Sequence, residues 1–212
     1  MNLILLGAPG AGKGTQAEIL KKHLRIPSIS TGNMLREAMA NGSDLGVRVK
    51  SYMDEGRLVP DELVLSIVAE RVREADCKNG FILDGVPRTL YQAQELDRLG
   101  VRIDHVVSLE IDDSVIVERM SGRRVCPKCG ASYHVSANPP MREGTCDSCR
   151  TKLAIRKDDA PETVRNRLKI YHDTTEVLKE YYEKQGKLCV IEGNQPIEGA
   201  NADILRAIGE MK

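Results

Sequence analysis

The sequence predicts an α/β fold in which a five-stranded parallel sheet has helices on both faces. Three observations predict it. Short apolar runs alternate with helix-like segments along most of the 212 residues. A glycine-rich loop joins the first apolar run to the first helix. Only residues 122–159 lack both patterns, and they contain four cysteines. Strands that alternate with helices form a parallel sheet, because each connecting helix packs back on that sheet.

The first apolar run, Leu3-Ile4-Leu5-Leu6, leads into Gly7-Ala8-Pro9-Gly10-Ala11-Gly12-Lys13-Gly14-Thr15 and then a helix at 15–24. This order is typical of a phosphate-binding loop, in which backbone N–H groups and a helix N-terminus surround a phosphate. Lys13 supplies a charge for the terminal phosphates, and Thr15 supplies a hydroxyl near a bound magnesium ion. Gly14 departs from the usual pattern, which has Ser or Thr after the lysine. A glycine-rich turn without a ligand is the alternative.

The remaining elements follow from apolar runs, cap residues and turn residues. We expect further strands at 27–30, 81–84, 105–111 and 188–191. We expect helices at 33–40, from Ser43 to about Gly56, from Pro60 onward, and at 89–99, 114–120, 161–184 and 197–208. Residues 122–159 have too few apolar side chains for a core of their own, so we expect them to form a small inserted domain held by a metal.

Composition limits the function classes. Lys+Arg and Asp+Glu both number 31, and aromatic residues make up 3%. A balanced charge argues against a general nucleic-acid or membrane surface, and scarce aromatics leave few platforms for stacking bases. The first apolar run is too short to span a membrane and lacks the basic start and cleavage site of a signal peptide. We therefore expect a cytoplasmic protein with no nucleic-acid or membrane partner.

Four of the six cysteines form two pairs, Cys126-Pro-Lys-Cys129 and Cys146-Asp-Ser-Cys149. This is the spacing of a zinc ribbon, and four thiolates fill every tetrahedral position, so the Zn²⁺ would be structural. A disulfide framework is the alternative, and it fits poorly with a chain of this size without a secretion signal.

Ligands of open α/β sheets bind at the carboxyl ends of the strands. Asp84 ends the run Phe81-Ile82-Leu83, where a carboxylate can hold magnesium beside a phosphate loop; capping a helix is its alternative role. Arginines recur at the ends of elements, and singly each is expected to be a solvated charge. Together they suit two nucleotides that meet phosphate to phosphate, because guanidinium forks neutralise and orient phosphates. These arginines are Arg36, Arg88, Arg119, Arg123, Arg156 and Arg167.

A series of motifs then carries a resemblance. The first motif is the glycine-rich loop in its Gly-Lys-Gly-Thr form. Five others follow it along the chain: Ser30-Thr31-Gly32-Asn33-Met34-Leu35-Arg36, Asp84-Gly85-Val86-Pro87-Arg88-Thr89, Gly122-Arg123-Arg124, Arg156-Lys157-Asp158-Asp159 and Thr163-Val164-Arg165-Asn166-Arg167-Leu168. In this order, over essentially the whole chain, they resemble the adenylate kinase family. The four cysteines are similar to those of its zinc-binding subset.

The resemblance implies magnesium-dependent transfer of a phosphoryl group from ATP to AMP, giving two ADP, by a monomer with three parts. These are a core at 1–29, 60–121 and 160–212, a helical AMP-binding flap at 30–59 and a zinc-binding lid at 122–159. The implied ATP-binding residues are Gly10, Ala11, Gly12, Lys13, Gly14, Thr15, Arg119, Arg123, Ser132, Tyr133 and Gln195. The implied AMP-binding residues are Thr31, Arg36, Arg57, Leu58, Val59, Gly85, Val86, Pro87, Arg88, Gln92, Arg156 and Arg167. The catalytic candidates are Lys13, Asp84, Arg88, Arg123, Arg156 and Arg167.

Two positions depart from the family's commonest pattern: Asn33 replaces an Asp, and Val86 replaces a Phe. Asn33 removes a carboxylate near the phosphates, which bears on the water around the metal and not on the class of reaction. A sibling kinase acting on UMP, CMP or GMP is the second hypothesis. A zinc-ribbon NTPase that binds nucleic acid is the third, and the balanced charge argues against it.

Overall fold

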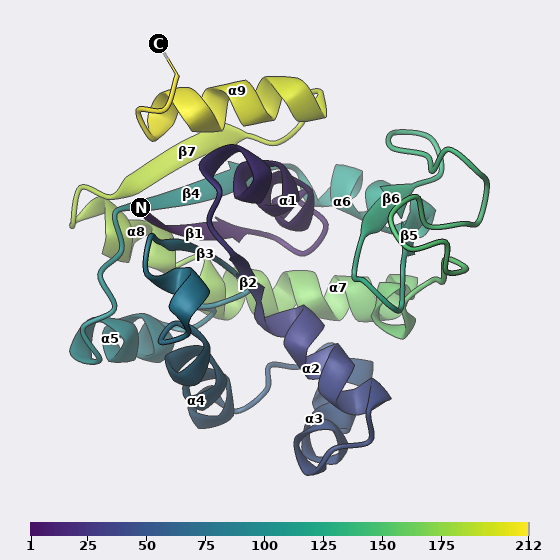
Figure 1. The fold of residues 1–212 in the computed structure, drawn as a ribbon, viewed down its shortest axis with the longest axis horizontal. Coiled ribbons are helices and arrows are strands. Elements are labelled where there is room, and N and C mark those ends of the chain that lie inside the picture. Colours follow the sequence, from purple (N-terminus) through teal and green to yellow (C-terminus); the bar gives the residue numbers. More distant parts are fainter. Residues whose placement is uncertain (212) are drawn as a thin grey trace.

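A parallel sheet with the strand order β2-β3-β1-β4-β7 organises the computed structural model, which describes residues 1–211 (Figure 1). The strands are β1 (Asn2–Gly7), β2 (Ser28–Ser30), β3 (Phe81–Asp84), β4 (His105–Glu110) and β7 (Leu188–Glu192). All neighbouring pairs run parallel, and Leu5 of β1 is in register with Asp84 of β3. The predicted fold class is confirmed. Residue 212, the last of the predicted core, lies outside the described residues.

Alternate side chains of the strands belong to two cores, one on each face of the sheet. Ile4 and Leu6 of β1 are buried on one face, and Leu3 and Leu5 are buried on the other. The first core lies against α4 (Asp61–Arg71), α5 (Leu90–Arg98) and α8 (Leu178–Glu183). The second lies against α1 (Lys13–Leu24) and α9 (Ile197–Ala207). Both faces are therefore covered, which explains why the central strands β1 and β3 consist of continuous apolar runs.

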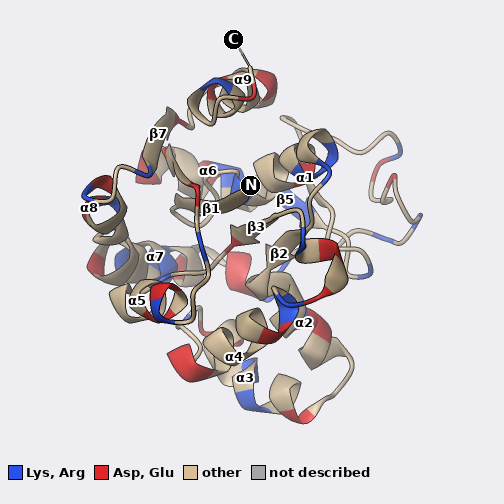
Figure 2. Cartoon of the chain, turned by 60° about the vertical axis from the view of Figure 1, so that its left-hand side comes forward, with Lys and Arg blue, Asp and Glu red and all other residues tan. Residues whose placement is uncertain are grey.

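Charged residues of both signs are mixed along the outer helices, and the central strands contain few of them (Figure 2). This distribution agrees with the zero net charge. Within residues 1–211, no helix combines the length and the apolar character that a membrane crossing requires.

Two smaller units project from the sheet (Figure 1). One is the helix pair α2 (Thr31–Ala40) and α3 (Asp44–Asp54), where Ser43 caps α3 by accepting a hydrogen bond from the backbone N–H of Gly46 at 3.2 Å. The other follows α6 (Asp113–Gly122) and contains the antiparallel strands β5 (Arg123–Val125) and β6 (Ser132–His134). The sequence pattern did not predict these two short strands.

The helix predicted at 161–184 is interrupted. It consists of α7 (Pro161–Ile170), a π-helical segment η3 (Tyr171–Thr175) and α8, and the prediction of one regular helix is wrong at this point. Two short 3₁₀ turns, η1 (Ala75–Cys77) and η2 (Lys157–Asp159), complete the described elements. A π segment shifts the side chains that follow it around the helix axis, and such segments are frequent at functional sites.

Candidate active site

A single cleft of about 540 Å³ lies over the carboxyl ends of β1 and β3 and extends between the two projecting units. Its walls include every nucleotide-contacting residue predicted above except Val86, whose side chain is 1% exposed and belongs to the core beneath the site. Residues that are distant in sequence, such as Lys13, Gln92 and Gln195, therefore line one cavity.

The glycine loop joins β1 to α1 at one end of this cleft. Gly7 has a φ of +133°, and a Cβ there would lie 2.6 Å from the carbonyl oxygen of Leu109, so only glycine fits. The ammonium of Lys13 donates to the carbonyl oxygens of Gly7 and Ala8 at 2.6 and 2.8 Å. Burial lowers the pKa of Lys13 to about 7, while Asp84 acts in the opposite direction. A phosphate bound at this loop would favour the charged ammonium.

Asp84 is the last residue of β3, and its carboxylate faces both the loop and β2. Its Oδ2 accepts from the hydroxyl of Ser30 at 3.3 Å, and a Cβ added to Gly14 would lie 3.8 Å from this oxygen. Carboxylate and hydroxyl oxygens are the protein ligands that Mg²⁺ accepts, usually with several waters retained. Asp84 and Thr15, which both line the cleft, are therefore the donor set that fits magnesium.

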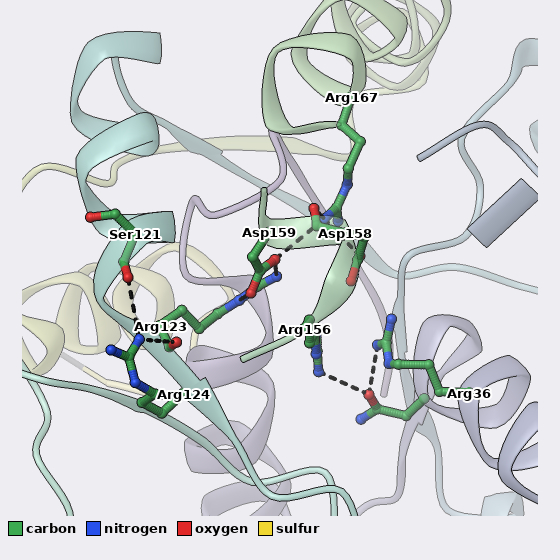
Figure 3. Close-up of polar contacts among 9 residues, drawn as sticks. Arg36, Ser121, Arg123, Arg124, Arg156, Asp158, Asp159 and Arg167 are labelled. Carbon is green, nitrogen blue, oxygen red and sulfur yellow. Dashed lines mark hydrogen bonds and ion pairs between the residues drawn. The ribbon is translucent and has the colours of Figure 1, made fainter. Parts of the chain in front are cut away.

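Four arginines from four segments converge on the middle of the cleft around two aspartates (Figure 3). Arg123 donates to both carboxylate oxygens of Asp159, through Nε at 2.8 Å and through Nη2. Arg167 donates to Oδ2 of Asp158 at 2.8 Å and to its carbonyl oxygen at 3.0 Å. The other two, Arg36 and Arg156, have no carboxylate partner among the described ion pairs. These aspartates hold two of the guanidinium groups in place.

Asn33 supplies the partner of the other two arginines. Its amide oxygen accepts from Nη2 of Arg36 at 2.8 Å and from Nη2 of Arg156 at 3.4 Å. A neutral amide thus occupies the position where the family's commonest pattern has a carboxylate. It orients two cations without neutralising them.

Burial and the crowding of cations in this partly enclosed space lower the pKa values of several arginines. Burial, with the other arginines adding to it, lowers the pKa of Arg156 to about 9 and the pKa of Arg167 to about 10. Burial also lowers the pKa of Arg36 and of Arg88. Burial opposes the charge of Asp158, but Arg167 and its neighbours still bring the pKa of this carboxyl below its usual value. An excess of desolvated positive charge is the electrostatic condition that favours binding of several phosphates.

Arg88 lies beside this group on the loop after β3. Its Nε donates to the carbonyl oxygen of Gly85 at 2.9 Å, and its backbone N–H donates to Oε1 of Gln92 at 2.7 Å. Its carbonyl oxygen accepts from the hydroxyl of Thr175 at 2.8 Å. Thr31, the first residue of α2, donates to the carbonyl oxygen of Gly85 at 3.0 Å. The backbone around Arg88 is therefore held from three elements.

The other predicted residues lie along the two arms of the cleft. Arg57 donates to Glu55 at 2.7 Å and lies 4.5 Å from the ring centroid of Tyr52. Arg119 donates to the carbonyl oxygen of Gly193 at 3.1 Å. The side-chain amide of Gln195 donates to the carbonyl oxygen of Glu192 and to Asp203, at 2.8 and 2.9 Å. The cleft is lined in these arms by Arg57, Leu58, Val59, Pro87, Ser132 and Tyr133 as well.

The four predicted metal ligands form one cluster. The Sγ atoms of Cys126, Cys129, Cys146 and Cys149 all lie within 4.8 Å of one another, and the shortest pairs are 3.3 and 3.5 Å apart. These separations exceed a disulfide bond of about 2.05 Å and are close to the roughly 3.8 Å edge of a tetrahedron with 2.3 Å Zn–S bonds. The donor set therefore fits Zn²⁺, and the disulfide alternative fails.

Several residues at the site had no role predicted from the sequence. Asp158 and Asp159 stood in a quoted motif, but they received no role. His134 was assigned to no pattern, yet it lines the cleft, and its Nε2 is a buried atom without a hydrogen-bond partner. Thr175 lines the cleft from the π-helical segment, which left no signal in the apolar pattern.

Comparison with known proteins agrees with this geometry. The sequence model of the adenylate kinase family matches residues 5–187. The chain is 53% identical to an adenylate kinase of Caldicellulosiruptor bescii over 213 residues, which cover 99% of each chain. It is 50% identical to an adenylate kinase of Acetivibrio thermocellus over 216 residues, which cover all of both chains. The chain belongs to the adenylate kinase family. The predicted family and the predicted adenylate kinase activity are confirmed.

Proposed function

We propose that this adenylate kinase carries out the reversible reaction ATP + AMP ⇌ 2 ADP in the cleft, with ATP at the glycine loop and AMP at the arm beside α2 and α3. The main support for this placement of ATP and AMP is the convergence of basic side chains between the two arms of the cleft. These side chains are Lys13, Arg36, Arg88, Arg123, Arg156 and Arg167. Two nucleotides that enter from opposite arms would bring their phosphates to this group.

On the ATP side, backbone N–H groups of residues 10–15 and the N-terminus of α1 would surround the phosphates. Lys13 would exchange its two carbonyl partners for phosphate oxygens. Arg119, Arg123, Ser132, Tyr133 and Gln195 line the same arm and would contact the rest of ATP.

On the AMP side, Arg36 and Arg88 would bind the phosphate, because each now has only a neutral partner in Asn33 or Gly85. Gln92, at the far end of this arm, would contact the base. The remaining AMP contacts would come from Thr31, Arg57, Leu58, Val59 and residues 85–87.

Phosphoryl transfer needs positioning and charge stabilisation more than a nucleophilic side chain. A phosphate oxygen of AMP attacks the terminal phosphorus of ATP, and the bond from that phosphorus to the bridging oxygen breaks, which leaves ADP on both sides. Arg123, Arg156 and Arg167 would stabilise the charge on the transferring group, and Lys13 and Arg88 would flank it. Preorganised charges of this kind are usually the largest catalytic contribution.

The two metals would have separate tasks. Asp84 and Thr15 would hold Mg²⁺, directly or through water, and this ion supplies charge neutralisation for the ATP phosphates. The four cysteines would hold a structural Zn²⁺, with no open position for substrate. Zinc would supply folding free energy to a segment whose own apolar cluster is small.

We further propose that residues 30–59 form a flap over AMP and that residues 122–159 form a lid over ATP, both moving on the core of a monomer. Closure would exclude water, which otherwise competes with AMP as the phosphoryl acceptor. We place the hinge of the lid near Gly122, where an added Cβ would collide with the ring of His134, so a larger residue would have to displace this ring.

The test is turnover of nucleotide pairs by purified protein with Mg²⁺, with zinc measured in the same sample. AMP should be strongly preferred over CMP, UMP and GMP as the acceptor. Lys13→Ala and Arg88→Ala should each lower kcat at least about 100-fold, through loss of charge at the transferring phosphoryl group. Lys22→Ala and Arg98→Ala, at exposed positions, are the matched controls and should retain parental turnover. Near-parental kcat in either cleft variant would exclude that residue's role, and equal use of UMP or CMP would favour the sibling kinases.

A further inference from the structure

A hydrogen-bonded chain connects the start of α4 to the base end of the AMP arm. The carboxylate of Asp61, the first residue of α4, accepts from Nε2 of Gln92 through Oδ1 at 2.7 Å and from the hydroxyl of Thr89 through Oδ2 at 3.0 Å. Oε1 of Gln92 accepts from the backbone N–H of Arg88 at 2.7 Å. Gln92 is 2% exposed and lines the cleft, whereas Asp61 does not line it.

These partners fix which end of the Gln92 amide points in which direction. A carboxylate only accepts hydrogen bonds, and a backbone N–H only donates them. If the amide turned over, its oxygen would face the carboxylate of Asp61, and its NH₂ would face the N–H of Arg88. Both contacts would be repulsive in a buried place, where unsatisfied polar groups are costly.

Asp61 is not placed as an ordinary acidic residue in the first turn of a helix. Such a residue stabilises the free N–H groups of its own helix. Both oxygens of Asp61 instead accept from side chains at the start of α5. Glu62, next to it and exposed, is the second acidic residue of the same turn.

The amide of Gln92 keeps one N–H and one oxygen lone pair after these contacts. The pairing edge of adenine offers an acceptor, N1, beside a donor, the 6-amino group, so it complements one N–H and one lone pair. Hypoxanthine, of nearly the same size and shape, offers the reverse: N1 carries a proton and O6 accepts. The orientation of the Gln92 amide therefore distinguishes AMP from IMP.

We propose that Asp61 is a specificity-determining residue that acts through Gln92, by holding its amide in the orientation that accepts adenine and rejects 6-oxopurines. Asp61 touches no substrate and is a positioning residue. The inference rests on the proposed function, because it requires the base of AMP to lie at Gln92.

The experiment measures kcat/KM for AMP and for IMP at saturating MgATP, with the full-length protein and its zinc. In Asp61→Ala, which lacks the acceptor, the AMP:IMP ratio should fall at least about tenfold. This fall should come mainly through a higher KM for AMP, with the KM for ATP unchanged. In Asp61→Asn, whose amide can still present an oxygen to Gln92, the ratio should lie between that of Asp61→Ala and the parental value. Glu62→Ala is the matched control and should leave the ratio unchanged.

A purely structural role of Asp61 would lower the melting temperature and leave the AMP:IMP ratio unchanged, which would overturn the inference. Gln92→Leu separates the two proposals. If Gln92→Leu loses the preference for AMP while both Asp61 variants retain it, the base lies at Gln92 and Asp61 does not determine specificity. If Gln92→Leu also retains the preference, the proposed position of AMP is wrong, and this inference fails with it. If Asp61→Ala does not fold, Asp61→Asn with the same readout decides.

Discussion

Replacing Thr175 by valine should weaken both the fold and the reaction through one hydrogen bond. The hydroxyl of Thr175 donates to the carbonyl oxygen of Arg88 at 2.8 Å, and the side chain is 8% exposed. Valine has nearly the same shape, so packing is conserved while the donor is lost. The carbonyl oxygen of Arg88, which is partly buried, then loses this partner.

The size of the effect follows from the geometry. A buried polar group left unsatisfied costs about 1–3 kcal/mol of unfolding free energy. For a chain of this length, each kcal/mol corresponds to a fall in melting temperature of about 2–4 °C. We therefore expect Thr175→Val to melt roughly 4–8 °C lower, for a central cost of about 2 kcal/mol. Because the same bond fixes the backbone of Arg88, a small displacement of its guanidinium should also lower kcat about tenfold.

Calorimetry and steady-state kinetics provide the assay, and the neighbouring Thr174→Val is the matched control. The hydroxyl of Thr174 donates at 2.7 Å to the carbonyl oxygen of Ile170 on the preceding turn, away from the loop of Arg88. The control should lose some stability and no turnover, and both variants should keep the parental KM for ATP. If Thr175→Val matches its control in both measurements, the π-helical segment does not position Arg88.

Three further predictions concern the metal, pH and closure. Cys146→Ser should reduce bound zinc well below one equivalent and lower the melting temperature. It should also raise the KM for ATP while some turnover survives. If the variant lost all activity while the lid stayed folded, the metal would have a catalytic role. His172 donates hydrogen bonds to the carboxylates of Glu176 and Asp113, and these bonds raise its pKa. The stabilisation is therefore complete below the pKa of His172 in the unfolded chain and is lost as pH rises through its pKa in the folded protein. His172→Gln should therefore lower the melting temperature more at pH 6 than at pH 9, and an equal loss at both would show that its charge is irrelevant. A bisubstrate analogue that joins two adenosines should protect the flap and the lid from hydrogen exchange, whereas protection of the core alone would refute closure.

The sheet could be predicted because most of its strands are short apolar runs between glycine, proline or charged residues, with β2 (Ser-Ile-Ser) as the exception. Buried parallel strands have no polar face, so runs such as Phe81–Asp84 stand out in the sequence. The four cysteines were equally informative, since their spacing alone limits what they can bind. The strands β5 and β6 could not be predicted, because strands of three residues carry too little pattern.

The π-helical segment and the partners of the arginines could not be predicted from the sequence. Residues 161–184 keep a helical spacing throughout, and tertiary contacts decide where the extra residue is accommodated. Arg123 and Asp159, and likewise Asn33 and Arg156, come from segments far apart in the chain, so their pairing could not be predicted. Asn33 and Arg36 lie three residues apart on one helix, and their contact is local. The effect of Asn33 was left open at that point, and its contacts give it a physical meaning as a neutral acceptor.

The partners of the basic residues suggest how the cleft divides their work. Lys13, Arg36, Arg88 and Arg156 donate to carbonyl or amide oxygens. Exchange of such neutral acceptors for phosphate would replace a weaker hydrogen bond with a stronger, charge-assisted one, so these side chains would gain most when nucleotides bind. Arg123 and Arg167 already donate to Asp159 and Asp158 and would lose an ion pair on moving away. They are therefore suited to stay in place as fixed charges. Their interaction with the transferring phosphoryl group would grow only as its charge redistributes, which is the condition under which binding energy accelerates the chemical step.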